Sequence, residues 1–280
     1  MRFYAAAVYG FLYAPIALIV LFSFNSGHHA SSFEGFSAQW YGTAANNPFV
    51  MEAVLNSLIV AATSASLATV LGTAAALALQ RVTGVVRTIF DALIYIALIV
   101  PGIVIGIATL VAMVIALDLV NEALATLWMG DPAAVPRVEL GYGSIIAAHT
   151  LFAMALVIVI VRARIAGMDR SLIEASADLY ATPLGTFRQV TLPQILPAVV
   201  AGFLLSFTFS FDDYVIASFV NGSKTTLPIY VFASIRRGIT PEVNAIGSVV
   251  LAVSLSLLFG SQFLLRARGG GKARATGGGA

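Results

Sequence analysis

Cysteine is absent from this 280-residue sequence, and only 10% of its residues are charged. A chain without cysteine can form no disulfide bridge and no thiolate metal site. Its three histidines, His28, His29 and His149, offer little material for an imidazole metal site. A soluble domain carries about 25% charged residues, so a chain that is 59% hydrophobic has too few charges to cover its surface in water. We therefore expect much of that surface to face lipid.

Sequence motifs for nucleotide binding and hydrolysis are absent as well. The chain contains no GxxxxGKS or GxxxxGKT phosphate loop, no HExxH, no GxSxG and no GxGxxG. We therefore do not expect it to be an enzyme. If it uses the energy of a nucleotide, a partner must bind that nucleotide.

Six apolar segments are long enough to cross a bilayer, which takes about 20 residues. They cover approximately residues 4–24, 53–79, 88–117, 142–161, 199–220 and 243–265. The third contains Pro101-Gly102, where we expect a kink or a tilt. The first has no small-x-small cleavage site, so we interpret it as a retained helix and not as a signal peptide. The sequence predicts an all-α membrane protein with six transmembrane helices in one domain, residues 1–268 with a core at 50–265, and a disordered glycine-rich tail at 269–280.

The distribution of positive charge predicts the orientation. If the N-terminus is cytoplasmic, 11 of the 15 lysines and arginines lie inside, and the first external loop, Asn25–Glu52, has none. The outside then holds Arg137, Lys224, Arg236 and Arg237. This bias agrees with the positive-inside rule. We therefore expect cytoplasmic N- and C-termini, a cytoplasmic tail, and a cytoplasmic loop between the fourth and fifth spans.

That cytoplasmic loop contains Glu174–Pro193, the longest polar-rich stretch between two spans. Proline disfavours helix in the residue before it, so Thr182-Pro183 and Leu192-Pro193 should each interrupt a helix. The pattern predicts a short helix, a turn, a second short helix through Gly185–Val190, and entry into the fifth span. A short helix on this face could lie in a groove of another protein or on the membrane surface.

Two adjacent acids, Asp212 and Asp213, lie in the fifth apolar segment. A carboxylate at the centre of a membrane helix costs about 2.5–3.5 kcal/mol on insertion scales, so a functional role is the default interpretation. The candidate substrate pathway consists of the acid pair, as a unit, and its polar neighbours: Asp212, Asp213, Tyr214, Ser210 and Thr208. An anionic lining would suit a cationic amine, because opposite charges attract more strongly away from water. The alternative is a hydrogen-bonded pair that stabilises the helix bundle or a subunit contact.

The cytoplasmic loop resembles the EAA loop of ABC-importer permeases, whose pattern is E-A-A, a glycine four residues later, and then I-x-L-P. The positions that correspond to this loop are Glu174, Ala175, Ser176, Asp178, Leu179, Tyr180, Ala181, Pro183, Leu192 and Pro193. Ser176 stands in place of the second alanine, and Tyr180 in place of the glycine that allows a tight turn. We therefore expect an adjusted turn or a bulkier contact at Tyr180.

Further segments resemble the permeases of spermidine/putrescine importers: Asn56-Ser57-Leu58, Gly202–Gly222, Thr226–Tyr230 and Thr240–Ala245. The resemblance implies a multi-pass permease subunit of an ATP-driven ABC importer in a bacterial inner membrane, with putrescine, spermidine or a similar small cation as substrate. It implies three partners: a cytoplasmic ABC ATPase dimer that docks on the loop and binds ATP and Mg, a second permease subunit that is a related chain or another copy, and a periplasmic solute-binding protein. No cofactor is expected on this chain, and no nucleic-acid partner.

Three alternatives stay open. The same kind of permease could carry another small solute, such as an amino-acid derivative, an aminophosphonate, or a thiamine- or iron-type ligand. A stand-alone secondary transporter or channel is disfavoured because the sequence shows no internal repeat and has an organised cytoplasmic loop. A membrane scaffold that transports nothing would leave the two acids of the fifth span unexplained.

Overall fold

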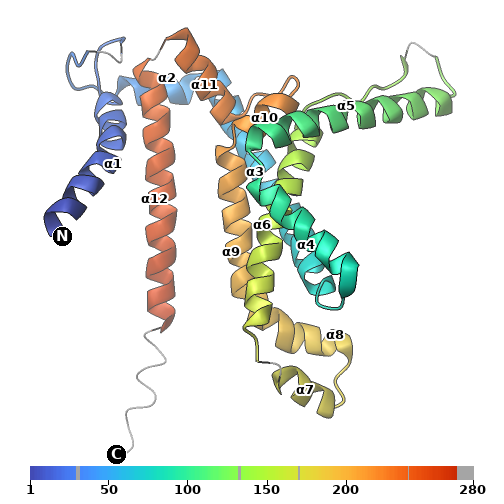
Figure 1. Cartoon of the computed structure of the whole chain (residues 1–280). Helices are drawn as coiled ribbons and strands as arrows, with labels where there is room; N and C mark the ends of the chain where they lie inside the picture. Colours follow the sequence, from blue (N-terminus) through green and yellow to red (C-terminus); the bar gives the residue numbers. More distant parts are fainter. Residues whose placement is uncertain (30–31, 132–133, 170, 239, 270–280) are drawn as a thin grey trace, which may run out of the picture. The chain divides into compact units, whose positions relative to one another are not determined.

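The computed structural model describes residues 1–29, 32–131, 134–169, 171–238 and 240–269, and their regular secondary structure is helical (Figure 1). The chain divides into two compact units. One unit combines Met1–Met51 with Val231–Ala280, and the other is Glu52–Tyr230. Of the tail predicted at 269–280, residues 270–280 lie outside the described residues, and Gly269 is the last residue of the final helix.

Five of the described helices are long and apolar enough to cross a membrane. They are α1 (Arg2–Phe22), α3 (Pro48–Ala78), α5 (Gly102–Leu127), α6 (Tyr142–Ala166), and the continuous helical run Pro183–Asp212 that ends with α9 (Leu192–Asp212). The last helix, α12 (Pro241–Gly269), contains a shorter apolar stretch, Pro241–Ser256. The prediction of an all-α membrane protein is confirmed.

The predicted third span is two helices and not one. Helix α4 (Gly84–Ile99) ends at Val100, which is extended with φ −62° and ψ 132°, and α5 begins directly after Pro101. The proline has no N–H group and disfavours helical geometry in Val100. The two helices run in different directions (Figure 1). The expected kink is therefore a complete break.

Helix α6 is the central element of the larger unit, where it packs against α4, α9 and α10 (Val215–Val220). Two buried apolar clusters lie along it. The first joins α6 to α3, α4 and α9 through Ala76, Leu79, Ile94, Ala155, Val157, Ile158, Val161 and Ile195. The second lies nearer the start of α6 and contains Val60, Ile145, Ala148, Ile216, Ala217 and Val220.

Glycines allow close helix approach at two places in this unit. A Cβ atom on Gly72 of α3 would lie 2.8 Å from Cβ of Val157, and one on Gly106 of α5 would lie 2.5 Å from Cδ2 of Phe219. Small residues are favoured at such contacts because lipid supplies no hydrophobic drive between helices. Residue 106 is part of the Gly102–Gly106 GxxxG pattern, and its ring contact joins α5 to α10.

In the smaller unit, α1 and α2 (Gln39–Asn46) both pack on α12. The segment before α2 is organised around Asn25, whose side chain accepts from the backbone N–H of Glu34 at 2.8 Å. Trp40 donates from Nε1 to the carbonyl of Asn25 at 2.9 Å. The side-chain amide of Asn47 donates to Glu242 at 2.9 Å and ties the end of α2 to the start of α12. Helix α11 (Leu227–Arg237) crosses the boundary between the two units.

Candidate functional site

A compact helical loop connects α6 to α9. It contains α7 (Ser171–Asp178), α8 (Pro183–Thr186) and one turn of π-helix, η2 (Phe187–Thr191). Helices α7 and α8 lie together beyond the ends of α6 and α9 (Figure 1). Neither α7 nor α8 has a buried residue. The loop is therefore ordered by local hydrogen bonds and presents its surface outward.

The first turn of α7 is capped by Asp169. Its Oδ1 atom accepts a hydrogen bond from the backbone N–H of Ser171 at 2.9 Å. Hydrogen bonds from the hydroxyl and backbone of Ser171 lower the pKa of the Asp169 carboxyl below its usual value. A negative charge at this position also interacts favourably with the positive end of the helix dipole.

Helix α7 ends in a Schellman motif with Tyr180 in the left-handed position. The N–H of Tyr180 donates to the carbonyl of Ala177 at 2.9 Å, and the N–H of Ala181 donates to the carbonyl of Ser176 at 3.1 Å. Tyr180 has φ 57°, the one non-glycine residue with a positive φ among the described residues. This position usually holds glycine, and it is the place where the EAA pattern has glycine. The tight turn is thus made by a tyrosine residue that is 96% exposed.

Ser176 joins α7 to α8. Its hydroxyl lies 2.8 Å from the hydroxyl of Thr186. At the start of α8, the hydroxyl oxygen of Thr182 accepts from the N–H of Gly185 at 3.2 Å. A serine in place of the second alanine of the EAA pattern therefore supplies a hydrogen bond across the turn that an alanine would lack.

The predicted second short helix through Gly185–Val190 is helical and is divided between α8 and η2. Its predicted end is wrong, because Leu192-Pro193 does not interrupt the helix. The backbone instead passes through η2 into α9 without leaving helical geometry. A proline ring clashes with the carbonyl four residues before it, and a wider π-type turn accommodates such a mismatch.

A cleft of about 1430 Å³ lies between this loop and the adjoining ends of α3, α4 and α6. Its charged lining residues are Arg81, Arg87, Arg162 and Glu174. Asp91 forms ion pairs with Arg162 and with Arg87, the latter at 3.7 Å between Nε and Oδ2. Within the described chain, Glu174 forms no salt bridge and is exposed. Its carboxylate is available to a partner.

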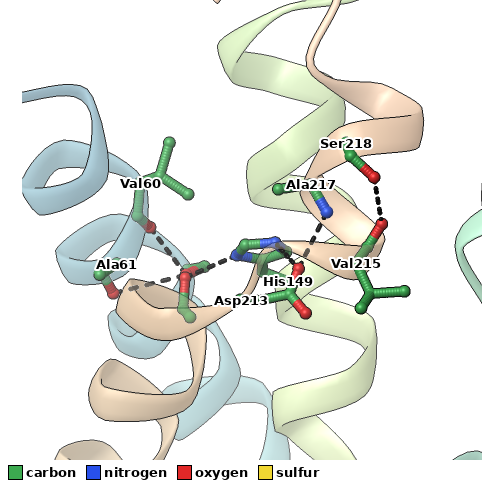
Figure 2. Close-up of polar contacts among 9 residues, drawn as sticks. Val60, Ala61, His149, Asp213, Val215, Ala217 and Ser218 are labelled. Carbon is green, nitrogen blue, oxygen red and sulfur yellow. Dashed lines mark hydrogen bonds and ion pairs between the residues drawn. The ribbon is translucent and has the colours of Figure 1, made fainter. Parts of the chain in front are cut away.

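The second group of predicted residues lies at the break between α9 and α10. Helix α9 ends at Asp212, and Asp213 is extended, with φ −71° and ψ 119°. Asp213 Oδ2 accepts from the N–H of Ala217 at 2.9 Å and lies 3.2 Å from Nε2 of His149 on α6 (Figure 2). The side chain of Asp213 is only 8% exposed.

His149 continues these contacts into the bundle. Its side chain is buried, and Nδ1 lies 2.7 Å from the hydroxyl of Ser210. Ser210 in turn lies 2.9 Å from the hydroxyl of Ser64 on α3, which donates to the carbonyl of Val60 at 2.7 Å. His149 was not among the residues predicted for this site. The signal available was a histidine within an apolar span, a residue type that is rare there and usually functional.

The predicted pathway residues divide between two environments. Ser210 and Asp213 face the interior of the bundle. Thr208 and Asp212 lie four residues apart on one face of α9, and both are exposed. No hydrogen bond or ion pair joins the Asp212 side chain to another described residue, whereas Thr208 donates to the carbonyl of Leu204 at 3.0 Å. Tyr214 is half-buried at the N-cap of α10. The two adjacent acids thus do not share one environment.

The chain matches one family, described as "Binding-protein-dependent transport system inner membrane component", over residues 68–268. It is 36% identical over 260 residues to the spermidine/putrescine transport system permease protein PotC of Haemophilus influenzae, across 92% of this chain and 93% of that protein. It is 42% identical over 244 residues to the putrescine transport system permease protein PotI of Escherichia coli K12, across 86% of this chain and 82% of that protein.

Among solved structures, the chain is similar to one from a bacterial ABC transporter involved in the import of the acidic polysaccharide alginate. The TM-score is 0.67 over 94% of this chain and 93% of that chain, with 15% sequence identity. At this level of identity the likeness concerns the fold alone.

Proposed function

Because the chain belongs to the family of binding-protein-dependent transport system inner membrane components, we propose that it takes up putrescine, spermidine or a similar small cation as part of an ABC importer. The family places it in the inner membrane as a multi-pass permease component and not as the ATPase. The polyamine substrate is our inference from the names of the relatives and from the carboxylate at the end of α9.

The exposed carboxylate of Asp212 is the observation that carries the choice of a cation. It lies at the C-terminal end of an apolar helix, where the helix dipole disfavours negative charge. No described residue neutralises it, although a charge in a membrane span is costly. An ammonium group about 4 Å away would gain roughly 4 kcal/mol at an effective dielectric constant of 20. Thr208 lies one turn earlier on the same face and adds a polar neighbour.

The proposed topology has six spans, with α12 as the sixth and cytoplasmic N- and C-termini. The loop α7–η2 is then the cytoplasmic EAA-type loop between the fourth and fifth spans. Its exposed apolar side chains include Leu179, Tyr180 and Leu184. Large exposed apolar groups on a water-facing loop favour a protein partner. We assign this surface, with Glu174, to the groove of a cytoplasmic ABC ATPase dimer.

The remaining partners follow from the same proposal. The ATP and Mg belong to the ATPase. A second permease subunit, either a related chain or another copy, completes the pathway, and a periplasmic binding protein delivers the substrate. The coupling of ATP hydrolysis to transport is a two-state change that the partners bias.

Uptake of labelled putrescine into proteoliposomes tests the substrate. The vesicles contain the whole transporter, with ATP on the ATPase side and the binding protein on the other. We expect spermidine to compete, and 4-aminobutyrate, which has the same chain length but also carries a carboxylate, not to compete. Asp212→Asn should reduce uptake at least tenfold, which corresponds to about 1.4 kcal/mol, and Asp212→Glu should retain part of it. Uptake that survives Asp212→Asn would remove Asp212 from the pathway. Uptake by this chain alone, driven by an ion gradient, would favour a secondary transporter.

Charge reversal tests the docking surface. Glu174→Lys should abolish co-purification of the chain with the ATPase, because it places a positive charge on the exposed first turn of α7. Glu139→Lys is the matched control, an exposed acid near the opposite end of α6. Retained co-purification of the Glu174→Lys variant would overturn the docking assignment and leave the substrate assignment untouched.

A further inference from the structure

Four polar side chains form a buried network across three helices of the larger unit. We call Ser64, His149, Ser210 and Asp213 the His149 network (Figure 2). His149 is 0% exposed and Ser210 is 4% exposed. Such a set within apolar helices is costly unless each member is hydrogen-bonded. The distribution of its hydrogen atoms therefore decides what the network can do.

The hydroxyl hydrogens can be assigned from one end of the network. Ser64 donates its single hydrogen to the carbonyl of Val60 at 2.7 Å. In the 2.9 Å contact between the two serine hydroxyls, Ser210 must then be the donor. With its own hydrogen used, Ser210 can only accept from Nδ1 of His149. Nδ1 therefore carries a hydrogen.

The other ring nitrogen of His149 faces the carboxylate of Asp213 at 3.2 Å. Two unprotonated acceptors at this distance would repel each other, so the pair holds a second proton, although the geometry at Nε2 does not form a hydrogen bond. This proton is either on Nε2, as an imidazolium beside a carboxylate, or on Asp213, as a carboxylic acid beside a neutral imidazole. The pair has zero net charge in both cases.

We propose that His149 is a positioning residue for cation transport. It neutralises Asp213 and holds it at the break between α9 and α10, and so it leaves Asp212 as the carboxylate that meets the substrate. This inference rests on the proposed uptake of a cationic amine. It explains why two adjacent acids differ: Asp213 lies 3.2 Å from Nε2 of His149 and accepts from the N–H of Ala217 at the start of α10, whereas Asp212 is exposed.

A rescue experiment tests the proposal. His149→Gln keeps a polar side chain of similar reach but cannot take the second proton, so Asp213, wherever it is ionised, is a buried charge without compensation. Removing one partner of a buried pair is strongly destabilising, and we expect putrescine uptake to fall roughly tenfold or more. Adding Asp213→Asn removes that charge, because an asparagine amide can bond both the glutamine and the N–H of Ala217. The double variant should recover to within about threefold of the native uptake.

Controls separate positioning from packing. Ser206→Ala changes another buried serine on α9, outside the network, and should leave uptake unchanged. If His149 only fills space, Asp213→Asn will not restore the His149→Gln variant, and this result would overturn the proposal. ATPase activity stimulated by the binding protein should fall less than uptake in His149→Gln, since the coupling loop is unchanged. An equal loss of both would also count against positioning.

The thermal unfolding midpoint of the purified transporter gives a readout that needs no substrate. His149→Gln should lower it, and the double variant should raise it again. If this rescue occurs but the native transporter takes up neither putrescine nor spermidine, the proposed function and the positioning role of His149 are both wrong. The neutral pair of His149 and Asp213 is then still supported. If the native transporter takes up putrescine but the double variant restores neither uptake nor the unfolding midpoint, only the inference about His149 is wrong, and the proposed function is unaffected.

Discussion

Replacing Tyr180 with glycine should stabilise the end of α7. An L-residue in the left-handed region costs about 1–2 kcal/mol that glycine does not incur. Glycine loses about 0.5–1 kcal/mol more conformational entropy on folding. Tyr180 is 96% exposed, so removal of its ring loses almost no packing within the described chain. The net gain expected for the turn is on the order of 0.5–1 kcal/mol.

Amide hydrogen exchange measures this gain directly. The N–H groups of residues 180 and 181 close the Schellman motif, so their protection reports the opening of the turn. A gain of about 1 kcal/mol should slow their exchange roughly fivefold, since 1.4 kcal/mol corresponds to tenfold. Tyr180→Ala is the matched control because it removes the ring and keeps the Cβ atom that causes the strain. Equal protection in the glycine and alanine variants would refute the argument from strain.

The same two variants separate strain from recognition. If the exposed ring contacts the ATPase, both variants should weaken co-purification equally, whatever their effect on the turn. If the residue acts only through the turn, neither should weaken it. Because local strain of this kind tends to persist at functional sites, we expect the first result. Full co-purification of both variants would remove the ring from the docking surface.

Two further predictions concern packing and the loop. Gly106→Ala places a Cβ atom 2.5 Å from Cδ2 of Phe219 and should destabilise the contact of α5 with α10 by about 1–3 kcal/mol. Thermal unfolding measures this loss, with Gly143→Ala as the control because its Cβ would meet no atom within 4 Å. Equal unfolding midpoints for the two variants would contradict the close approach. Ser176→Ala removes the hydrogen bond to Thr186 and should destabilise the α7–α8 turn by about 1 kcal/mol. Hydrogen exchange of the loop amides measures this loss. If Ser176→Ala has the same effect in a Thr186→Val background, the hydrogen bond between the two hydroxyls is not the cause.

The long apolar segments were predictable because a helix must be long and apolar to cross a bilayer. The residues at which the helices end were harder to predict. Pro101 marked the third segment, and proline chemistry alone allows either a kink or a break. The break is accompanied by contacts that no local pattern encodes, including the approach of Phe219 to Gly106. Before Pro193 the backbone stays helical and accommodates the proline through a π-type turn. Residue type therefore located both disturbances, and tertiary packing decided their form.

The turn at Tyr180 was predictable in position and unexpected in detail. The spacing to Leu192-Pro193 indicated a turn where glycine is usual, so a change of geometry was a reasonable expectation. Tyr180 instead adopts the left-handed conformation that glycine usually takes at this position, with φ 57°. Sequence cannot distinguish these outcomes, because both satisfy the same spacing. The difference is a local strain energy that the hydrogen bonds of the Schellman motif offset.

The acids of the fifth span show most clearly where sequence reasoning stops. Asp212 and Asp213 are identical in chemistry and adjacent in the chain, so composition and hydropathy cannot separate them. Helix α9 ends between them, and the change in backbone direction turns one toward His149, which is far away in sequence, and leaves the other exposed. A histidine in an apolar span indicates a buried polar partner but does not say which one. If Asp213 is neutralised, the net negative charge of the pair equals that of a single carboxylate, and the site would bind one ammonium group of a diamine at a time.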